Sequence, residues 1–357
     1  MPSSVHRAPR RPQPTPGVPS GTRCGDRVRS ACQDLYRARR LRPRDQLVRA
    51  CQPHPERTTE IELGADAELF NGRLGLGATV YSRRTSGFIT FTVTPPSSAF
   101  SYQLINGGEI WNQGVELELT AQPIRSEQTA LDIRLGAWGN RNRAARITQF
   151  LLPVGFRQWV FWGYPVGTYY TVLVQGFNDA NGDGVLTSNE ITRSDVVPSG
   201  SPLPTQGAFA SIAVAWHRWL GLSTTVEYRG GGSQQDLTAA GRCQVVVCAA
   251  RSVPGTPLTE QARAVADGLG LEGQPLDAGF VRLREVSLTI TAPATWAARV
   301  GAKTLHLTLA GRNLLTWTPY RGLDPEVNAL GQRGVSMVDS FTQPLLRRWI
   351  ARLDLEF

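Results

Sequence analysis

Apolar and polar residues alternate through much of the chain after Pro55. The alternation has no error across residues 60–69, and the same period returns across residues 74–80. A period of two places apolar side chains on one face of a β-strand and polar side chains on the other. Further alternating stretches are residues 115–119, 131–135, 222–228, 286–290 and 305–309. Together they predict an all-β, antiparallel sheet of about ten strands with two chemically different faces.

Local signals between these stretches agree with a sheet. Asn71-Gly72 separates the first two stretches, and this dipeptide is the strongest short signal for a β-hairpin. Around Arg284 and Glu285 the parity slips by one residue, which predicts a β-bulge.

The last nine residues form a further alternating stretch that ends the chain on an aromatic residue. Its apolar positions are Trp349, Ala351, Leu353, Leu355 and Phe357. Chain ends usually fray, whereas the last strand of a β-barrel must pair to close the cylinder. The terminal strand therefore favours a barrel.

Alternation alone does not separate a membrane barrel from a soluble antiparallel sheet. Two further features favour an up-and-down transmembrane β-barrel with long external loops. Short Gly/Asn turns alternate with connections of roughly 30–50 residues, and aromatic residues lie near strand ends, where interfacial girdles occur. These aromatics are Tyr81, Trp138, Trp216, Trp219, Tyr228, Trp317, Trp349 and Phe357. The alternative is a β-sandwich whose core holds these aromatic residues.

Composition excludes several classes of protein. Apolar residues make up 41% of the 357-residue chain, so it is not disordered by composition. There is no run of about 18 apolar residues, which excludes a transmembrane helix. Residues 1–17 also lack the apolar core of a secretory signal.

The formal charge of +9 lies entirely in the first part of the chain. Residues 1–57 hold thirteen arginines and four acidic residues, so residues 58–357 are neutral. This distribution disfavours a nucleic-acid-binding function, whose signature would be salt-dependent DNA retention. We expect residues 1–56 to be an Arg/Pro-rich leader, either disordered or read in a shifted frame, and residues 57–357 to form the barrel part.

Five cysteines occur, and three of them lie in the leader. The other two, Cys243 and Cys248, are five positions apart after a Gly-rich segment. A disulfide between them is the favoured interpretation, with two free thiols as the alternative. A zinc site is disfavoured because one cysteine pair without a nearby histidine is half a site.

Residues 179–190 match the calcium-loop pattern D-x-[DN]-x-[DN]-G-x5-E at every position. Oxygen ligands would come from side chains and from one backbone carbonyl, and Gly184 would permit the sharp turn. The flanking residues 169–174 are β-like rather than helical, so a plain polar turn remains the alternative. The candidate Ca²⁺ ligands are Asp179, Asn181, Asp183, Val185, Thr187 and Glu190.

Residues 258–271 form the one clear helical stretch, with Leu258, Ala262, Val265 and Leu269 on one face. We expect it to pack in an external loop, with contact to a partner as the alternative. No catalytic grouping is apparent, since the four histidines are isolated and no Ser/His/Asp arrangement occurs. An enzyme is therefore not expected.

Several segments resemble TonB-dependent outer-membrane receptors of the SusC/RagA type. Residues 55–64 (PERTTEIELG) resemble a strand opening of the family, and residues 280–288 (FVRLREVSL) resemble a strand near its C-terminus. Residues 310–327 (AGRNLLTWTPYRGLDPEV) are similar to a segment of the SusC/RagA branch. Residues 163–167 (GYPVG), followed by Asp183-Gly184, fit the same branch.

The resemblance implies an outer-membrane receptor that imports oligosaccharides, peptides or similar nutrients using energy delivered by TonB. It also implies contact with outer-membrane lipid, with TonB, with a SusD-like surface lipoprotein, and with the barrel-assembly machinery. That machinery would read the terminal strand through Trp349, Leu353, Leu355 and Phe357. A plug, a TonB-contacting segment and about half of the family's 22 strands are not recognisable. We therefore expect a C-terminal barrel fragment that does not transport alone. The alternative function is a secreted β-sandwich adhesion module with a Ca²⁺ loop.

Overall fold

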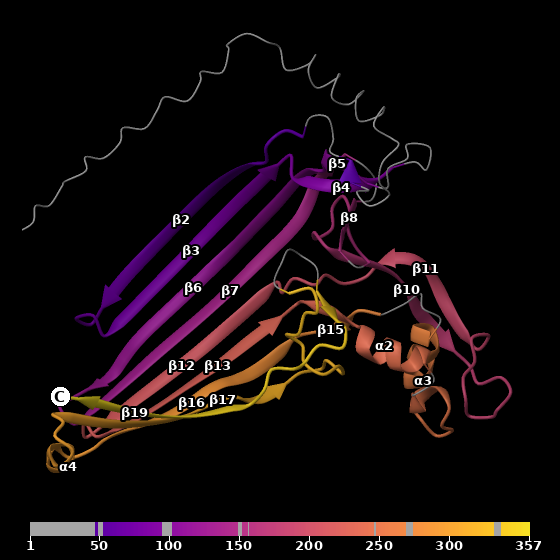
Figure 1. The fold of residues 1–357 in the computed structure, drawn as a ribbon. Helices are drawn as coiled ribbons and strands as arrows, with labels where there is room; N and C mark the ends of the chain where they lie inside the picture. The colour runs from indigo at the N-terminus through magenta and orange to yellow at the C-terminus, as the bar shows by residue number, and fades with distance from the viewer. Residues whose placement is uncertain are drawn as a thin grey trace, which may run out of the picture.

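A nine-stranded antiparallel sheet dominates the computed structural model (Figure 1). The structure describes residues 47–48, 53–94, 102–148, 152–155, 157–245, 248–268, 274–331 and 337–357. The predicted leader therefore lies almost wholly outside the described residues. The strands of the sheet, in spatial order, are β2 (Arg57–Leu69), β3 (Leu74–Ser86), β6 (Gly108–Arg125), β7 (Thr129–Ile147), β12 (Gln206–Trp216), β13 (Leu220–Gly230), β16 (Phe280–Thr291), β17 (Thr304–Trp317) and β19 (Arg348–Glu356).

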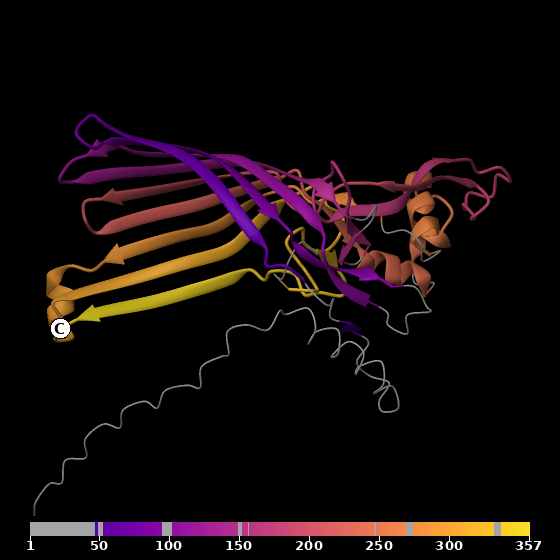
Figure 2. The same ribbon diagram turned by 90° about the horizontal axis from the view of Figure 1, so that it is seen from above.

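The spatial order of these strands follows their order along the chain, as in an up-and-down barrel wall. Figure 2 shows one continuous wall running from the indigo β2 to the yellow β19. Within the described residues, β2 and β19 are the two edges of the sheet and do not pair with each other. The prediction of an all-β, antiparallel, up-and-down wall is confirmed.

Register carries the sequence alternation across the whole sheet. Leu63 pairs with Val80, Val80 with Val115, and Val115 with Gly139. Directly opposed residues in a sheet share a face, so this row and its neighbours two residues away form one apolar face. Glu118, which pairs with Gly77 and Gly136, belongs to the opposite, polar face.

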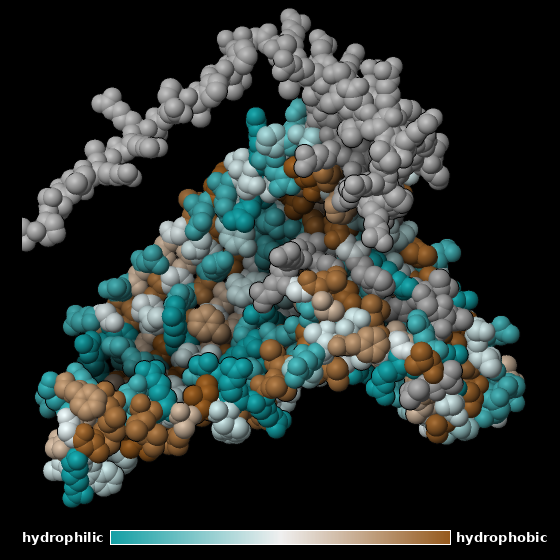
Figure 3. Space-filling model, in the orientation of Figure 1, coloured by the Kyte–Doolittle hydropathy of each residue, from teal (hydrophilic) through white to brown (hydrophobic). Residues whose placement is uncertain are grey.

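No layer formed by the described residues covers the apolar face of the sheet. Ile61, Leu63 and Leu353 are 67%, 69% and 59% exposed. In Figure 3, hydrophobic residues gather at the lower left, over the end of the sheet that carries the C-terminus. A β-sandwich would cover such a face with a second sheet, so the sandwich interpretation is not favoured.

Both local sequence signals have the expected backbone consequences. Asn71 and Gly72 adopt left-handed conformations (φ 57° and 75°) in the tight turn between β2 and β3. The register of β16 against β17 shifts between Leu283 and Glu285, which places Arg284 in the predicted bulge.

The connections at the end of the sheet opposite Asn71-Gly72 are long and carry structure of their own. The described parts of residues 87–107, 148–205, 231–279 and 318–347 are termed the loop layer (Figure 1). It contains β4 (Ile89–Val93), β5 (Tyr102–Asn106), β8 (Leu152–Gly155), β9 (Gln158–Val160), β10 (Thr168–Phe177), β11 (Ile191–Pro198), β14 (Ser233–Asp236), α2 (Leu237–Gln244), η2 (Ala249–Arg251), α3 (Leu258–Gly268), β15 (Leu276–Asp277) and β18 (Val338–Asp339). The strand β1 (Leu47–Val48) pairs with β5, and α4 (Ala294–Arg299) lies at the opposite end of the sheet.

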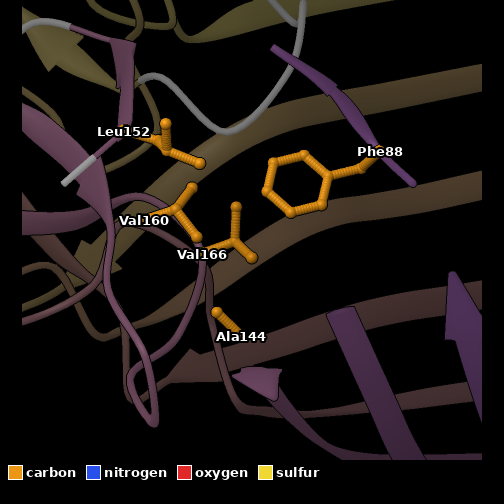
Figure 4. Packing of buried hydrophobic residues seen from close by; sticks show 5 residues of the cluster. All are labelled: Phe88, Ala144, Leu152, Val160 and Val166. Carbon is orange, nitrogen blue, oxygen red and sulfur yellow. The ribbon is translucent and has the colours of Figure 1, made fainter. Parts of the chain in front are cut away.

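Burial is concentrated in the loop layer. One cluster joins Phe88, Ala144, Leu152, Val160 and Val166 where β7 leaves the sheet (Figure 4). These five side chains converge from four separate stretches of chain, so they fix the loop layer to the wall.

A second cluster packs α3 against the β10–β11 hairpin. It joins Leu186 and Ile191 to Ala262, Val265 and Ala266 of the helix. The predicted loop helix is therefore confirmed to Gly268, and residue 269 lies outside the described residues. No helix in the described ranges is both long and apolar enough to cross a bilayer.

Candidate functional site on the polar face and in the loop layer

Ion pairs between neighbouring strands cover the polar face of the sheet. Glu60 pairs with Arg83 at 2.8 Å, and Glu118 pairs with Arg134 at 2.6 Å. In a transmembrane barrel such a face lines the interior. The face is therefore suited to contact water and polar solutes.

A buried ionic network ties one long connection to the polar face. The guanidinium of Arg282 lies 2.7 Å from Asp324 Oδ1 and 2.8 Å from Glu326 Oε2, and only 1% of the Arg282 side chain is exposed. The Asp324 carboxylate also accepts hydrogen bonds from the backbone N–H of Glu326 and Leu345. The two acidic residues thus hold the connection after β17 against β16.

Arg284, the bulged residue, extends this network. Its two terminal nitrogens each lie 2.6 Å from an oxygen of Glu326, and its Nε lies 2.6 Å from Glu227 on β13. The guanidinium carbons of Arg282 and Arg284 lie over the ring of Phe280, at 5.3 and 5.6 Å from the ring centre. The bulge thereby aims a strand residue at the loop layer.

Both halves of this network lie in family-like segments of the sequence, but no sequence pattern pairs them. Arg282 and Arg284 stand in one family-like segment, and Asp324 and Glu326 stand in another. The only sequence feature that indicates the network is the parity slip at Arg284. It shows that this residue does not take part in the regular pairing of the two strands.

Asp339 forms a second buried polar centre. It is fully buried and accepts hydrogen bonds from the Tyr320 hydroxyl at 3.0 Å and from Thr238 Oγ1 at 2.9 Å. Burial, together with the charges of Asp236 and Asp339, raises the pKa of the Tyr320 hydroxyl. Tyr320 therefore remains a neutral donor to Asp339, and Asp339 links the connection after β17 to Thr238 of α2.

Asp236 begins α2, and its carboxylate accepts the backbone N–H of Ala239 at 2.8 Å. Burial raises the pKa of the Asp236 carboxyl, and the nearby charge of Asp339 adds to this effect. In the structure a disulfide joins Cys243 at the end of this helix to Cys248. The disulfide borders a cleft of about 310 Å³ that Arg263 and Arg321 also line.

The predicted calcium loop connects β10 to β11, and its carboxylates turn inward onto their own backbone. Asp179 accepts hydrogen bonds from the N–H groups of Gly182 and Gly184, each at 2.9 Å. Asn181 accepts from Asp183 N at 3.0 Å, and Asp183 accepts from Val185 N at 2.8 Å. Gly184 has φ +77°, as the sharp turn requires.

Glu190 closes the loop from its far end. Its carboxylate accepts the backbone N–H and the hydroxyl of Thr187, both at 2.8 Å, and the N–H of Ala180 at 3.1 Å. The Thr187 hydrogen bonds hold the pKa of the Glu190 carboxyl below its usual range. The loop thus folds back on itself with Asp179 and Glu190 at its base.

The residue types of this loop suit a Ca²⁺ site, but its acidic groups are not gathered around one point. In the part of the chain that the structure describes, no three His, Cys, Asp or Glu residues stand close enough together to hold a metal ion. The carboxylates instead receive backbone N–H groups. Carboxylate oxygens accept more than one contact each, so these hydrogen bonds leave acceptor capacity for an oxygen-liganded cation.

Gln261 of α3 supports this loop through three hydrogen bonds. It is 1% exposed, accepts the N–H of Leu186 at 2.8 Å and donates to the carbonyl oxygens of Gly184 and Thr256. No sequence pattern predicts this contact, because Gln261 and Gly184 are 77 residues apart in the chain. Through Gln261, the helix α3 therefore fixes the position of the backbone at Gly184 and Leu186 in the loop.

Three residues of the predicted assembly signal, Trp349, Leu353 and Leu355, lie on the edge strand β19, and the fourth, Phe357, follows directly after it. Leu353 pairs with Leu307 and Leu355 with Leu305, all on the apolar face. Trp349, Leu353, Leu355 and Phe357 are all exposed. Of the histidines, His306 lies on the polar face, where its ring nitrogen contacts Thr291 Oγ1 at 2.9 Å.

Comparison with known proteins gives a consistent family. The family model described as "TonB dependent receptor-like, beta-barrel" matches residues 45–255. The chain is 24% identical over 327 residues to TonB-dependent receptor P26 of Formosa agariphila, covering 79% of this chain and 32% of the relative. It is 22% identical over 339 residues to TonB-dependent receptor SusC of Bacteroides thetaiotaomicron, covering 85% of this chain and 32% of SusC.

Among solved structures, the RagAB peptide transporter has the same fold over the shared region. The TM-score is 0.64 at 21% identity, covering 85% of this chain and 35% of the matched chain. The chain thus spans about a third of the length of the relatives that it matches.

Proposed function

Because the chain belongs to the TonB-dependent receptor family, we propose that its sheet forms part of the wall of an outer-membrane nutrient transporter of the SusC/RagA type. Proteins of this family are outer-membrane transport receptors. In this proposal the apolar face contacts lipid and the polar face borders the path of the cargo.

One observation carries this proposal. Nine strands paired in one continuous sheet present charged residues on one side and, on the other, an apolar face that no layer of described residues covers. A soluble protein leaves few apolar patches of such size exposed. A lipid environment removes this penalty, because hydrocarbon covers the apolar face as protein would.

We propose that the cargo is an oligomeric nutrient such as a peptide or an oligosaccharide. The peptide part of this proposal is supported by one matched structure, which is that of a peptide transporter. TonB as the source of energy and a SusD-like lipoprotein over the loop layer are the proposed partners. We also propose that residues 1–56 are a separate leader and that the barrel part begins at Arg57.

Two features of the loop layer have proposed roles in this frame. The loop between Asp179 and Glu190 would bind Ca²⁺ through oxygen ligands and stiffen the external surface. The disulfide between Cys243 and Cys248 would fix the end of α2 in an oxidising environment. Both would act on the face that meets cargo and lipoprotein.

The proposal is tested by recovering the full chain from cells that produce it. We expect it in the outer-membrane fraction, soluble only with detergent, and migrating faster on gels before boiling than after. Recovery from the soluble fraction without detergent, together with a Ca²⁺-dependent melting temperature, would instead support a secreted β-sandwich module.

A further inference from the structure

Basic and aromatic residues replace apolar ones where the apolar face reaches the loop layer. The row formed by Arg84, Trp111 and Arg143 lies four residues beyond the row of Val80, Val115 and Gly139 and on the same face. In the next row Glu109 pairs with Arg146. Together with Trp162, these residues are termed the rim cluster: Arg84, Glu109, Trp111, Arg143, Arg146 and Trp162.

Contacts within the rim cluster neutralise its one acidic member. Arg84 lies 2.6 Å from Glu109 Oε2, and the indole N–H of Trp111 donates to the other oxygen of Glu109. Both carboxylate oxygens are therefore engaged by neighbours on the same face. Glu109 is buried, so its charge holds Arg84 in place rather than facing solvent.

Arg143 and Arg146 are the less compensated cations of the cluster, although Arg146 also stands opposite Glu109 and its charge acts on that carboxylate. Neither forms an ion pair with any described residue of the chain, whereas Arg84 does. The guanidinium of Arg143 lies 4.9 Å from the centre of the Trp111 ring, which orients it without neutralising it. With three arginines and one glutamate, the cluster has a formal charge of +2.

The cluster lines an open cavity of about 370 Å³, and backbone hydrogen bonds hold its wall in place. The backbone of Ala144 bonds to that of Gly163 and Tyr164, at 2.7 and 2.9 Å. The indole N–H of Trp162 donates to the carbonyl oxygen of Ala145 at 3.0 Å, although 71% of Trp162 is exposed. An exposed tryptophan held in this way is typical of a membrane interface.

The height of the cluster fits the headgroup region of a bilayer. On β7 the apolar rows run from Leu131 to Gly139, which is about 27 Å along the strand and about 20 Å along the bilayer normal at a tilt of about 40°. This length approaches the apolar band of about 25 Å expected for such a barrel. Arg143 lies four residues further, on the side of the long connections, which is the external side.

We propose that the rim cluster binds the phosphate group of a phosphorylated lipid in the outer leaflet. Arg143 and Arg146 contact the phosphate, because guanidinium groups make paired, charge-assisted hydrogen bonds to phosphate oxygens. Trp111 and Trp162 lie at the boundary between headgroup and acyl chains. Basic pockets on membrane-facing surfaces recognise anionic headgroups in this way. This inference rests on the membrane placement in the proposed function, but not on transport.

The test uses the full chain purified in detergent and native mass spectrometry with two lipids of identical acyl chains. Phosphatidic acid carries the phosphate, and diacylglycerol lacks it. We expect phosphatidic acid to bind and diacylglycerol to bind at least about tenfold more weakly. The variant R143Q/R146Q should lose at least about tenfold in affinity for phosphatidic acid, and R143K/R146K should lose less. The control R125Q, at the turn end of the same hairpin, should bind as the unmodified chain does.

Three results would overturn the inference. These are equal binding of the two lipids, unchanged binding by R143Q/R146Q, and displacement of phosphatidic acid by inorganic phosphate at millimolar concentration, which would indicate a site for free anions. Heat-modifiable gel mobility of every variant separates lost binding from lost folding. If the unmodified chain lacks that mobility, the membrane placement fails, and this inference fails with it.

Discussion

Arg282 of β16 and Asp324 form an ion pair of 2.7 Å across 42 residues of chain, with 1% and 7% of their side chains exposed. Both charged groups are buried away from solvent, so removing either charge leaves the other without full compensation and destabilises the fold. The pair joins a strand of the wall to the connection that follows β17. It therefore links the rigid part of the molecule to the surface that would meet cargo.

Replacing Asp324 by asparagine should destabilise the fold strongly. The substitution D324N removes one of the two carboxylates that pair with the buried Arg282 and leaves Glu326 as the other, at a cost of about 3 kcal/mol, the lower end of the range for a broken buried pair. The measurement is the denaturant-dependent loss of heat-modifiable mobility of the full chain. R312Q is the matched control, because Arg312 pairs with Glu285 on the exposed polar face at 2.6 Å. That variant should lose no more than about 1 kcal/mol, and equal losses for both variants would contradict a special role for the buried pair.

Calcium should bind the loop between β10 and β11. We expect isothermal titration of the full chain in detergent to show Ca²⁺ uptake. The variant E190Q should bind Ca²⁺ at least about tenfold more weakly, because it loses a charged carboxylate that would bind the ion through both of its oxygens. D195N, on the exposed part of β11, is the control and should bind normally. If the unmodified chain takes up no Ca²⁺ at millimolar concentration, the ligand assignment is wrong.

The same loop should loosen in acid. Hydrogen bonds from Thr187 hold the pKa of Glu190 below its usual range, so its folded pKa is lower than its unfolded pKa of about 4.3. The stabilisation is therefore present above that unfolded value and is lost as pH falls through the folded pKa. Hydrogen exchange at the Thr187 amide, corrected for intrinsic rates, should show protection falling below about pH 4. E190Q should show no such pH dependence, and constant protection of the unmodified chain down to pH 3 would refute the mechanism.

A single tryptic peptide reports on the proposed disulfide. Residues 243–251 follow Arg242 and end at Arg251, so this peptide contains both Cys243 and Cys248. Without reduction, its mass should be lower by two hydrogen atoms and alkylation should fail. Replacing both cysteines by serine should cost about 2 kcal/mol, the value expected for such a short closed loop. Complete alkylation of the unreduced protein would show two free thiols.

The wall was predictable from the sequence because its signals are local. The alternation across residues 60–69, the turn at Asn71-Gly72 and the slip at Arg284 each act within a few residues. The strand β12 was not recognised. Alanines at positions 208 and 210 face the apolar side, while Phe209 faces the polar side, so the two faces differ little in hydropathy.

The loop layer was predictable only in pieces. The helix from Leu258 and the turn at Gly184 follow from periodicity and from backbone conformation. Their connection through Gln261 joins residues 77 positions apart, and the pair of Arg282 and Asp324 joins residues 42 positions apart. Such contacts form only in the completed fold, and no periodic pattern in a single sequence predicts them.

The central claim is that one face of the sheet contacts lipid and the other contacts water. Spin labels placed one at a time at residues 115–119 of β6, in a chain whose native cysteines are replaced by serine, test this claim directly. Val115, Leu117 and Leu119 lie on the apolar face, and Glu116 and Glu118 lie on the polar face. In bilayers, collisions with oxygen should peak at 115, 117 and 119, and collisions with a water-soluble nickel chelate should peak at 116 and 118. Collision rates without a period of two, or with the nickel chelate reaching the apolar positions, would contradict the account.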